Sequence, residues 1–197
     1  MTERIGLFGG SFDPVHDAHL ALAREALAAL RLDRLVWIPA GQPWQKSRTM
    51  TPGVHRLAML RAALAGEPRF VIDERELRRD GPTYTIDTVR ELRAEHPEAE
   101  LVLVIGQDQY AGFHTWAGWR EILQTVDLAV ANRPGVPTVV DPEVQRHPHR
   151  MVPLPMLDIA ATDIRARAAR GERVDQLVPP QVARYIELHG LYRTAPP

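Results

Sequence analysis

The sequence contains no cysteine among its 197 residues. This absence excludes disulfide bonds, thiolate-bound zinc and a cysteine nucleophile, and it fits a reducing compartment. Long apolar runs are also missing, since no window approaches the roughly 20 residues of a membrane-spanning helix. The apolar run near the N-terminus is too short for a secretory signal. We therefore expect a cytoplasmic protein that does not bind membranes.

An excess of charge of one sign is missing as well. The chain has 24 Lys and Arg residues against 25 Asp and Glu residues, which gives a formal net charge of -1. Without a strong overall field we expect no nucleic-acid partner, and any bound anion needs a local site. The length and the 45% hydrophobic content indicate one globular domain over residues 1–197. The sequence leaves open whether the chain forms a homo-oligomer.

Several short runs are apolar at successive positions, which is typical of parallel strands buried on both faces. They occupy residues 5–8, 34–39, 69–72, 101–106 and 128–131, with a weaker run near 150. Helical patterns lie between them, over 20–30, 52–65 and 84–96. This alternation predicts an α/β fold, namely a Rossmann-like doubly wound parallel sheet with helices on both faces. The stretch 132–150 is predicted to be a surface excursion.

The last fifth of the chain has a different pattern. Residues 162–172 indicate a helix with Thr162 as its N-cap, and residues 179–190 indicate a second helix with proline at its start and glycine after its end. No strand pattern follows them. We therefore predict a Rossmann-like core over 1–158 and a small C-terminal helical cap over 159–197.

The stretch GGSFDPVHDAH, residues 9–19, follows the first predicted strand and enters a helix. Open α/β sheets bind ligands at this position. Gly9 and Gly10 allow the backbone to approach a ligand closely. His16 and His19, three residues apart, share a face of the first helical turn, where free N–H groups attract anions. The stretch is neither a dinucleotide fingerprint nor a P-loop, so it predicts a phosphate site of another class.

Two other interpretations of the histidine pair stay open. In the first, the glycines form a tight turn and the histidines pack or cap the helix. In the second, His16 and His19 bind a metal together with a third ligand, for which Asp13 or Asp17 is available.

Three further stretches carry polar groups at positions where a ligand can reach them. In IAATDIR, residues 159–165, Arg165 lies one turn inside a helix and can bind a phosphate with two N–H groups. A capped surface helix with a solvated arginine is the alternative. In VIGQDQY, residues 104–110, a buried strand ends at Gly106, and Asp108 can accept from ribose hydroxyls or adenine. Its alternative role is a helix N-cap.

The third stretch is GPTYTIDT, residues 81–88, taken together with FHTWAGW, residues 113–119. Thr85 offers a hydroxyl and a backbone N–H near a helix start, and Trp116 can stack on a flat heterocycle. Trp119, at helical spacing from Trp116, is predicted to lie in the core. Lys46 follows the second strand and is either a phosphate ligand or a solvated lysine.

These stretches resemble a known family. GGSFDPVHDAH and IAATDIR resemble the two signatures of the nucleotidylyltransferase superfamily. More narrowly, the chain resembles the bacterial nicotinate-nucleotide (nicotinic acid mononucleotide) adenylyltransferases from about residue 4 to residue 193, in the stretches GPTYTIDTV, IGQDQYAGFHTWAGWREIL and GLYR. The resemblance implies transfer of AMP from ATP to nicotinate mononucleotide. The products are nicotinic acid adenine dinucleotide and pyrophosphate, a late step in NAD synthesis.

The resemblance also implies roles for individual residues. It implies that the catalytic residues are His16, His19 and Arg165. It implies an ATP site that is formed by Gly9, Gly10, Ser11, His16, His19, Gly106, Asp108, Ile159, Thr162 and Arg165. It implies an acceptor site that is formed by Lys46, Thr85, Trp116 and Ala117, with the backbone at Trp116 and Ala117 facing the nicotinate carboxylate. Mg²⁺ is expected to arrive with ATP, and no resident protein-bound metal is expected.

The sequence departs from the family pattern at three places. Ala18 replaces a glycine between the histidines, Ala160 replaces a serine of the second signature, and PWQK replaces a histidine-lysine loop. The nearest alternative function is the same transfer to nicotinamide mononucleotide or another phosphomonoester acceptor, or a cytidylyl transfer. A nucleotide-binding sensor without turnover and a histidine-metal hydrolase are the alternatives from other classes.

Overall fold

The computed structural model describes residues 2–43, 50–132, 139–153, 157 and 159–193. The elements of its first half are β1 (Arg4–Gly10), α1 (Asp17–Ala29), β2 (Arg34–Pro39), β3 (Gln42–Pro43), α2 (Gly53–Ala63), β4 (Phe70–Ile72), α3 (Arg75–Arg78), β5 (Pro82–Thr83) and α4 (Thr85–Glu95). Those of the second half are β6 (Glu100–Gly106), α5 (Gln107–Ala111), the 3₁₀ helix η1 (Phe113–Thr115), α6 (Trp119–Thr125), β7 (Asp127–Asn132), α7 (Pro142–Arg146), β8 (His149–Pro153), α8 (Ala161–Ala169) and α9 (Pro180–Leu188).

Six strands form one parallel sheet in the order β4-β2-β1-β6-β7-β8. Counted within this sheet, the order is 3-2-1-4-5-6, which is that of a doubly wound dinucleotide-binding fold. The strand order reverses between β1 and β6, so the carboxyl ends of these two strands flank a crevice where such sheets bind ligands. The predicted Rossmann-like sheet is confirmed, and each of its six strands had been predicted from an apolar run.

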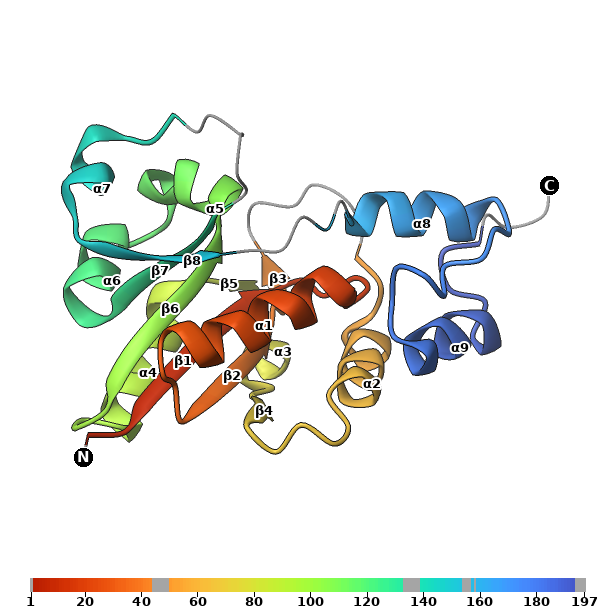
Figure 1. Cartoon of the computed structure of the whole chain (residues 1–197), viewed down its shortest axis with the longest axis horizontal. Helices are drawn as coiled ribbons and strands as arrows, with labels where there is room; N and C mark the ends of the chain where they lie inside the picture. Colours follow the sequence, from red (N-terminus) through yellow and green to blue (C-terminus); the bar gives the residue numbers. More distant parts are fainter. Residues whose placement is uncertain (1, 44–49, 133–138, 154–156, 158, 194–197) are drawn as a thin grey trace.

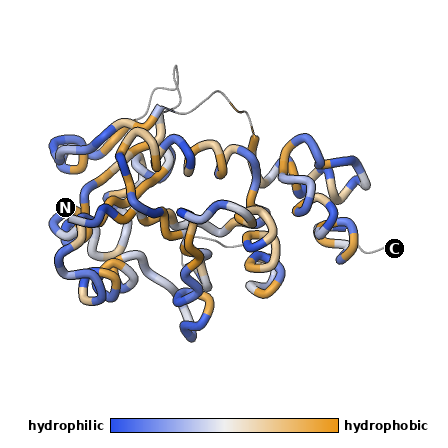
Figure 2. Tube along the Cα trace, turned by 60° about the horizontal axis from the view of Figure 1, so that its bottom comes forward, coloured by the Kyte–Doolittle hydropathy of each residue, from blue (hydrophilic) through white to orange (hydrophobic). Residues whose placement is uncertain are grey.

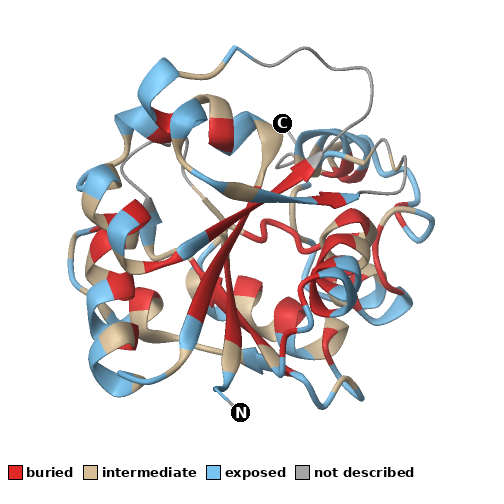
Figure 3. Cartoon of the chain, turned by 60° about the vertical axis from the view of Figure 1, so that its left-hand side comes forward, coloured by how far each residue is buried: buried red, intermediate tan, exposed pale blue. Residues whose placement is uncertain are grey.

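Both faces of the sheet are covered, which explains why successive strand positions are apolar. On β6, Val102 and Val104 belong to a cluster with residues of α1, α2, α8 and α9. Leu101 and Leu103 belong to a second cluster with residues of α4, α5, α6 and α7. Apolar residues concentrate in the strands and polar residues on the outer helices (Figure 2), and the strands are buried throughout the middle of the molecule (Figure 3).

The prediction of a surface excursion over 132–150 is wrong for the described part of that stretch. Residues 142–146 form α7, and β8 begins at residue 149. The Asp141 side chain caps α7 by accepting hydrogen bonds from the N–H groups of Glu143 and Val144. Val144 is fully buried. The Asp-Pro pair therefore starts a helix here, and the buried Val144 side chain packs that helix against the sheet.

The two C-terminal helices lie beside α2, on the face of the sheet that α1 also covers (Figure 1). Ile164 of α8 and Ile186 of α9 are buried in the cluster that contains α1. The predicted C-terminal part, a pair of helices without a following strand, is therefore present. The N-cap prediction is wrong, because α8 begins after an extended Ala160, and Thr162 lies inside its first turn.

Among the described residues, no helix has both the length and the apolar character to cross a membrane.

Candidate active site

A cavity of about 520 Å³ opens where β1 and β6 end. Its volume falls within the range of small-molecule sites. Most of the residues predicted to bind ligands line it: Gly9, Gly10, Ser11, His16, His19, Thr85, Gly106, Asp108, Trp116, Ala117 and Ile159. The structure thus brings together, at one place, stretches that are separated by up to 150 residues of sequence.

The two glycines that end β1 lack a side chain for different reasons. A Cβ built on Gly9 would meet no atom within 4 Å, so the missing side chain leaves open space beside the backbone. A Cβ on Gly10 would lie 2.9 Å from the ring of Phe12. The predicted close approach of a ligand is therefore supported at Gly9, whereas at Gly10 the packing of Phe12 requires glycine.

His19 is oriented by neighbours on three sides. Its Nδ1 accepts a hydrogen bond from the backbone N–H of His16 at 3.2 Å, which closes the first turn of α1. Its ring stacks on that of His16 with centroids 3.6 Å apart and meets the edge of Phe12 at 5.2 Å. Because Nδ1 accepts, the neutral ring carries its proton on Nε2, where it can be donated to a ligand.

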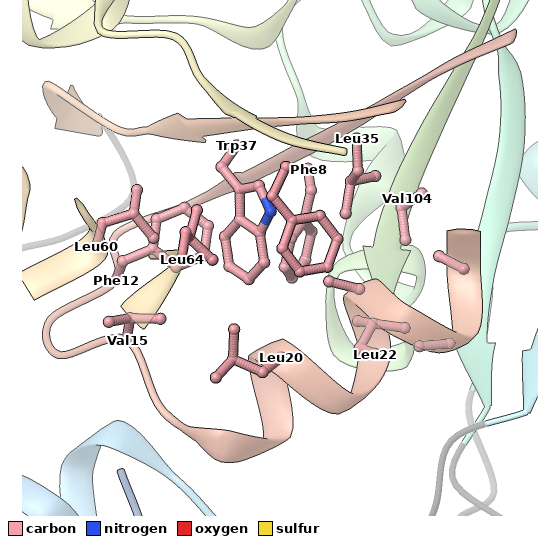
Figure 4. Packing of buried hydrophobic residues seen from close by; sticks show 14 of the residues in the cluster. Phe8, Phe12, Val15, Leu20, Leu22, Leu35, Trp37, Leu60, Leu64 and Val104 are labelled. Atoms are coloured by element: carbon pink, nitrogen blue, oxygen red, sulfur yellow. The ribbon is translucent and has the colours of Figure 1, made fainter. Parts of the chain in front are cut away.

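An aromatic cluster supports this pair from below. Phe8, Phe12 and Trp37 lie against one another with ring centroids 4.8 to 5.6 Å apart, above Leu20 of α1 (Figure 4). All three rings are buried. The alternative in which the histidines pack or cap the helix is therefore partly confirmed, because His16 is 6% exposed and the His19 side chain caps the first turn of α1. Both histidines nevertheless line the cavity.

Asp13 does not complete a metal site with the histidines. Its carboxylate accepts hydrogen bonds from the Tyr192 hydroxyl at 2.8 Å and from the Thr51 N–H at 3.3 Å. Over the described ranges, no three His, Cys, Asp or Glu residues are grouped so as to hold a metal ion. Asp17, the other candidate, begins α1, and burial raises the pKa of its carboxyl. The metal interpretation thus gains no support from the described residues.

The stretch 159–165, predicted to belong to the ATP site, is divided between the cavity and the loop before His16. Ile159 and Ala160 line the cavity at the start of α8. Thr162 and Arg165 are absent from the described residues that line it. Arg165 instead donates from Nη1 to the backbone oxygen of Asp13 at 2.7 Å and from Nη2 to the Thr162 hydroxyl at 3.1 Å. The arginine is thus tied to the loop that precedes His16, and it is not a simple solvated side chain.

At the end of β6, Gly106 is the N-cap of α5, and its N–H donates to the Gln109 side chain at 3.0 Å. Asp108 is exposed in the first turn and lines the cavity. The alternative in which Asp108 caps the helix is therefore wrong, because Gln109 makes the capping contact. Asp108 thus lines the cavity without a capping role, and its carboxylate can accept from hydroxyl or amine groups of a ligand.

A second wall of the cavity holds Thr85, Trp116 and Ala117 of the predicted acceptor site. Thr85 is the first residue of α4, and Trp116 ends η1 with its ring 5.0 Å from that of Phe113. Trp119 is only half buried, beneath the guanidinium of Arg120 at 4.2 Å. The prediction that Trp119 lies in the core is met only in part, because Trp119, like Trp116, is partly buried and packs against the edge of the second cluster. The two tryptophans do not share one helix, because Gly118 adopts a left-handed conformation between them. Lys46 lies outside the described residues.

The sequence reasoning missed a buried carboxylate in this wall. Glu76 of α3 lines the cavity, is 8% exposed and accepts a hydrogen bond from the Thr88 hydroxyl at 2.7 Å. Burial raises the pKa of Glu76, while Thr88 and Arg79 oppose the rise. Nothing in the charged run ERELRRD distinguishes this glutamate from a solvated one, so its burial could not be read from the sequence.

A buried arginine was missed too. Arg56 of α2 is 2% exposed and donates to the backbone oxygens of Ser11 at 2.8 Å and Thr51 at 2.9 Å. It holds the loop after β1 from behind the cavity. A signal existed in this case, because Arg56 shares the helical face of Met59 and Leu60, which are both fully buried.

The described lining carries two histidines and two carboxylates, and neither lysine nor arginine. Among these described lining residues, the groups that can attract a phosphate are therefore the His16 and His19 rings and the N–H groups where α1 and α8 begin. The two departures from the family signatures lie in these same turns. Ala18 is buried at the start of α1, and Ala160 precedes α8 without a side-chain cap.

Comparisons with known proteins agree with this geometry. Residues 7–167 match the family model described as cytidylyltransferase-like. A probable nicotinate-nucleotide adenylyltransferase of Bordetella petrii is 51% identical over 97% of this chain and 100% of its own. A protein of the same description from Methylibium petroleiphilum is 48% identical over 98% of this chain and 93% of its own.

Solved structures show the same fold at lower identity. The nicotinic acid mononucleotide adenylyltransferase of Plasmodium falciparum, complexed with NaAD, superposes with a TM-score of 0.78 at 18% identity, over 96% of this chain and 97% of that one. A putative nicotinate-nucleotide adenylyltransferase of Vibrio parahaemolyticus gives a TM-score of 0.72 at 19% identity, over 98% of both chains.

Proposed function

Because the chain belongs to the nicotinate-nucleotide adenylyltransferases of the cytidylyltransferase-like family, we propose that the described cavity is where it carries out their reaction. In this reaction AMP passes from ATP to nicotinate mononucleotide, which yields nicotinic acid adenine dinucleotide and pyrophosphate. One observation carries the proposal: the β1–α1 loop and the start of α8 line the same cavity as the start of α4 and the end of η1.

The ATP half comprises the loop after β1, the end of β6 and the start of α8. Gly9, Gly10 and Ser11 line the path of the phosphates, and Gly106 and Asp108 face the adenosine. The segment from Ile159 to Arg165 lies beside the triphosphate. Mg²⁺ belongs to the substrate in this scheme, because it travels on ATP oxygens and waters.

The chemistry needs positioning and charge stabilisation more than it needs a base. An oxygen of the acceptor's phosphate attacks the α-phosphorus of ATP, the bond to the bridging oxygen breaks, and pyrophosphate leaves with the electron pair. The attacking oxygen is already anionic at neutral pH. His19, with its proton on Nε2, donates to the oxygens that gain charge, and His16 stacks against it. Arg165 acts from the Asp13 side of the loop.

The acceptor half comprises Thr85, Trp116 and Ala117. The Trp116 ring offers a flat face to the pyridine ring, and the adjoining backbone and the first N–H groups of α4 face its carboxylate. Lys46 remains a proposed phosphate ligand on the basis of the sequence alone. The single domain with a division near residue 158 and the cytoplasmic location also stay predictions, and the sequence leaves the oligomeric state open.

The test is an acceptor panel in which pyrophosphate release is followed with ATP or CTP and each candidate acceptor. We expect the highest kcat/KM with ATP and nicotinate mononucleotide. A preference for nicotinamide mononucleotide would contradict the proposed carboxylate recognition. Tight ATP binding without pyrophosphate release from any acceptor would instead identify a sensor, and stoichiometric zinc or manganese in the purified protein would favour a hydrolase.

A further inference from the structure

Asp13 is a buried carboxylate that the proposed reaction does not use. It lies three residues before His16 and is 0% exposed. A buried carboxylate needs hydrogen-bond donors, because its desolvation is otherwise costly. Both of its oxygens have one: the Tyr192 hydroxyl donates to Oδ1 at 2.8 Å, and the Thr51 N–H lies 3.3 Å from Oδ2.

The backbone of the same residue holds a proposed catalytic group. Arg165 donates from Nη1 to the Asp13 carbonyl oxygen at 2.7 Å, across 152 positions of sequence. Asp17, at the start of α1, donates its N–H to the carbonyl oxygen of Leu177 at 3.1 Å. Three residues of the C-terminal part of the chain, Arg165, Leu177 and Tyr192, therefore contact the loop that carries His16. Of these contacts, that of Tyr192 spans the longest stretch of sequence.

The chain after α9 follows an unusual path to reach this loop. α9 ends at Leu188, and Gly190 adopts a φ of 57°. Tyr192 has a φ of 66°, which is uncommon for a bulky side chain and is kept only where its surroundings stabilise it. The hydrogen bond to Asp13 supplies such a contact. Burial and the nearby Asp13 charge raise the pKa of Tyr192, so the hydroxyl stays protonated and remains a donor at neutral pH.

We propose that Tyr192 is a positioning residue for the ATP half of the site, which it serves by holding Asp13 and, through Asp13, the loop of His16 and the guanidinium of Arg165. The inference rests on the proposed function, because it concerns the site of that reaction. The tail does not contact the acceptor wall in any hydrogen bond of the described residues. Loss of the hydroxyl is therefore expected to affect the use of ATP and to leave the acceptor in place.

The test is Tyr192→Phe, with Tyr185→Phe as the matched control. Tyr185 also lies in the C-terminal part, and its hydroxyl is bonded to His55 at 3.0 Å, away from the loop. Each variant loses one tyrosine hydroxyl. We expect Tyr192→Phe to lower kcat/KM for ATP roughly tenfold, the effect of losing one hydrogen bond to a charged group, with KM for nicotinate mononucleotide unchanged. Tyr185→Phe is expected to keep wild-type kinetics.

Three outcomes overturn the inference: unchanged ATP kinetics in Tyr192→Phe, the same loss in Tyr185→Phe, or equal increases in KM for both substrates. A wild-type chain that releases no pyrophosphate would instead contradict the proposed function. A second variant guards against misfolding. Asp13→Asn is made in the wild type and in Tyr192→Phe, where the Asp13 carboxylate has lost the tyrosine donor. If the two residues act together, Asp13→Asn should lower kcat/KM for ATP at least about threefold less in Tyr192→Phe than in the wild type. Additive effects would show that the two residues act separately.

Discussion

The two walls of the cavity are built in different ways. The ATP wall is formed by the end of β1 and the loop after it, the end of β6 and the start of α8. α2, α8 and the C-terminal tail hold its loop through polar contacts, such as Tyr192–Asp13, that join residues up to 179 positions apart. The acceptor wall comes from two shorter stretches, residues 76–88 and 113–117, each supported by its own helices. The first wall depends on the whole fold, whereas the second is largely a local structure. Variants should therefore separate the use of the two substrates.

The largest separation is expected from His19→Ala. His19 is placed to donate to oxygens that gain charge in the transition state, and removing one such donor typically lowers turnover about 100-fold to 1,000-fold. ATP affinity should fall far less, because other groups of the wall remain. Steady-state kinetics and ATP titration by calorimetry measure the two quantities. Unchanged turnover would end the assignment of His19.

Trp116→Ala is expected to act on the other wall. Loss of the flat ring should raise KM for nicotinate mononucleotide roughly tenfold and leave KM for ATP near its wild-type value. Trp119→Ala is the matched control, because Trp119 contacts Arg120 and is not among the described lining residues. If Trp119→Ala raised the acceptor KM as much as Trp116→Ala, the effect would come from loss of structure near η1.

The smallest effect is a pH dependence of stability at Glu76. A carboxyl whose pKa is higher in the folded state binds more protons there, so the contribution of Glu76 to the free energy of unfolding decreases as pH rises from about 4.5 through its folded pKa. The amide introduced by Glu76→Gln does not titrate in this range. The stability of Glu76→Gln relative to wild type should therefore increase from pH 4.5 to pH 7 in urea denaturation. Parallel pH profiles would show that burial does not perturb Glu76.

The sequence was sufficient to predict elements whose residues carry their own signal. β2 has the predicted bounds, 34–39, because a strand buried on both faces is apolar at every position. GGSFDPVHDAH was correctly placed at a strand end because glycine and histidine spacing are local properties. The predicted N-cap of α8 was wrong. Thr162 has a side chain that can cap a helix, but the extended backbone of an N-cap residue is found at Ala160.

The supports of the site could not be predicted in this way. Glu76 looks like an ordinary surface charge until α4 covers it. The helical face of Arg56 indicates burial, but not that its guanidinium bonds to the loop after β1. The role of Tyr192 depends on a partner 179 residues away, and no local pattern encodes that contact. Such long-range burial is a property of the assembled fold, so it becomes visible only in the structure.

The most direct test of the two-walled site is a crystal structure of the chain with nicotinic acid adenine dinucleotide, which spans both walls. We predict the adenosine beside Gly106 and Asp108, the phosphates at Gly9 and His19, and the pyridine ring against Trp116. A product bound in the reverse direction, or outside this cavity, would contradict the account.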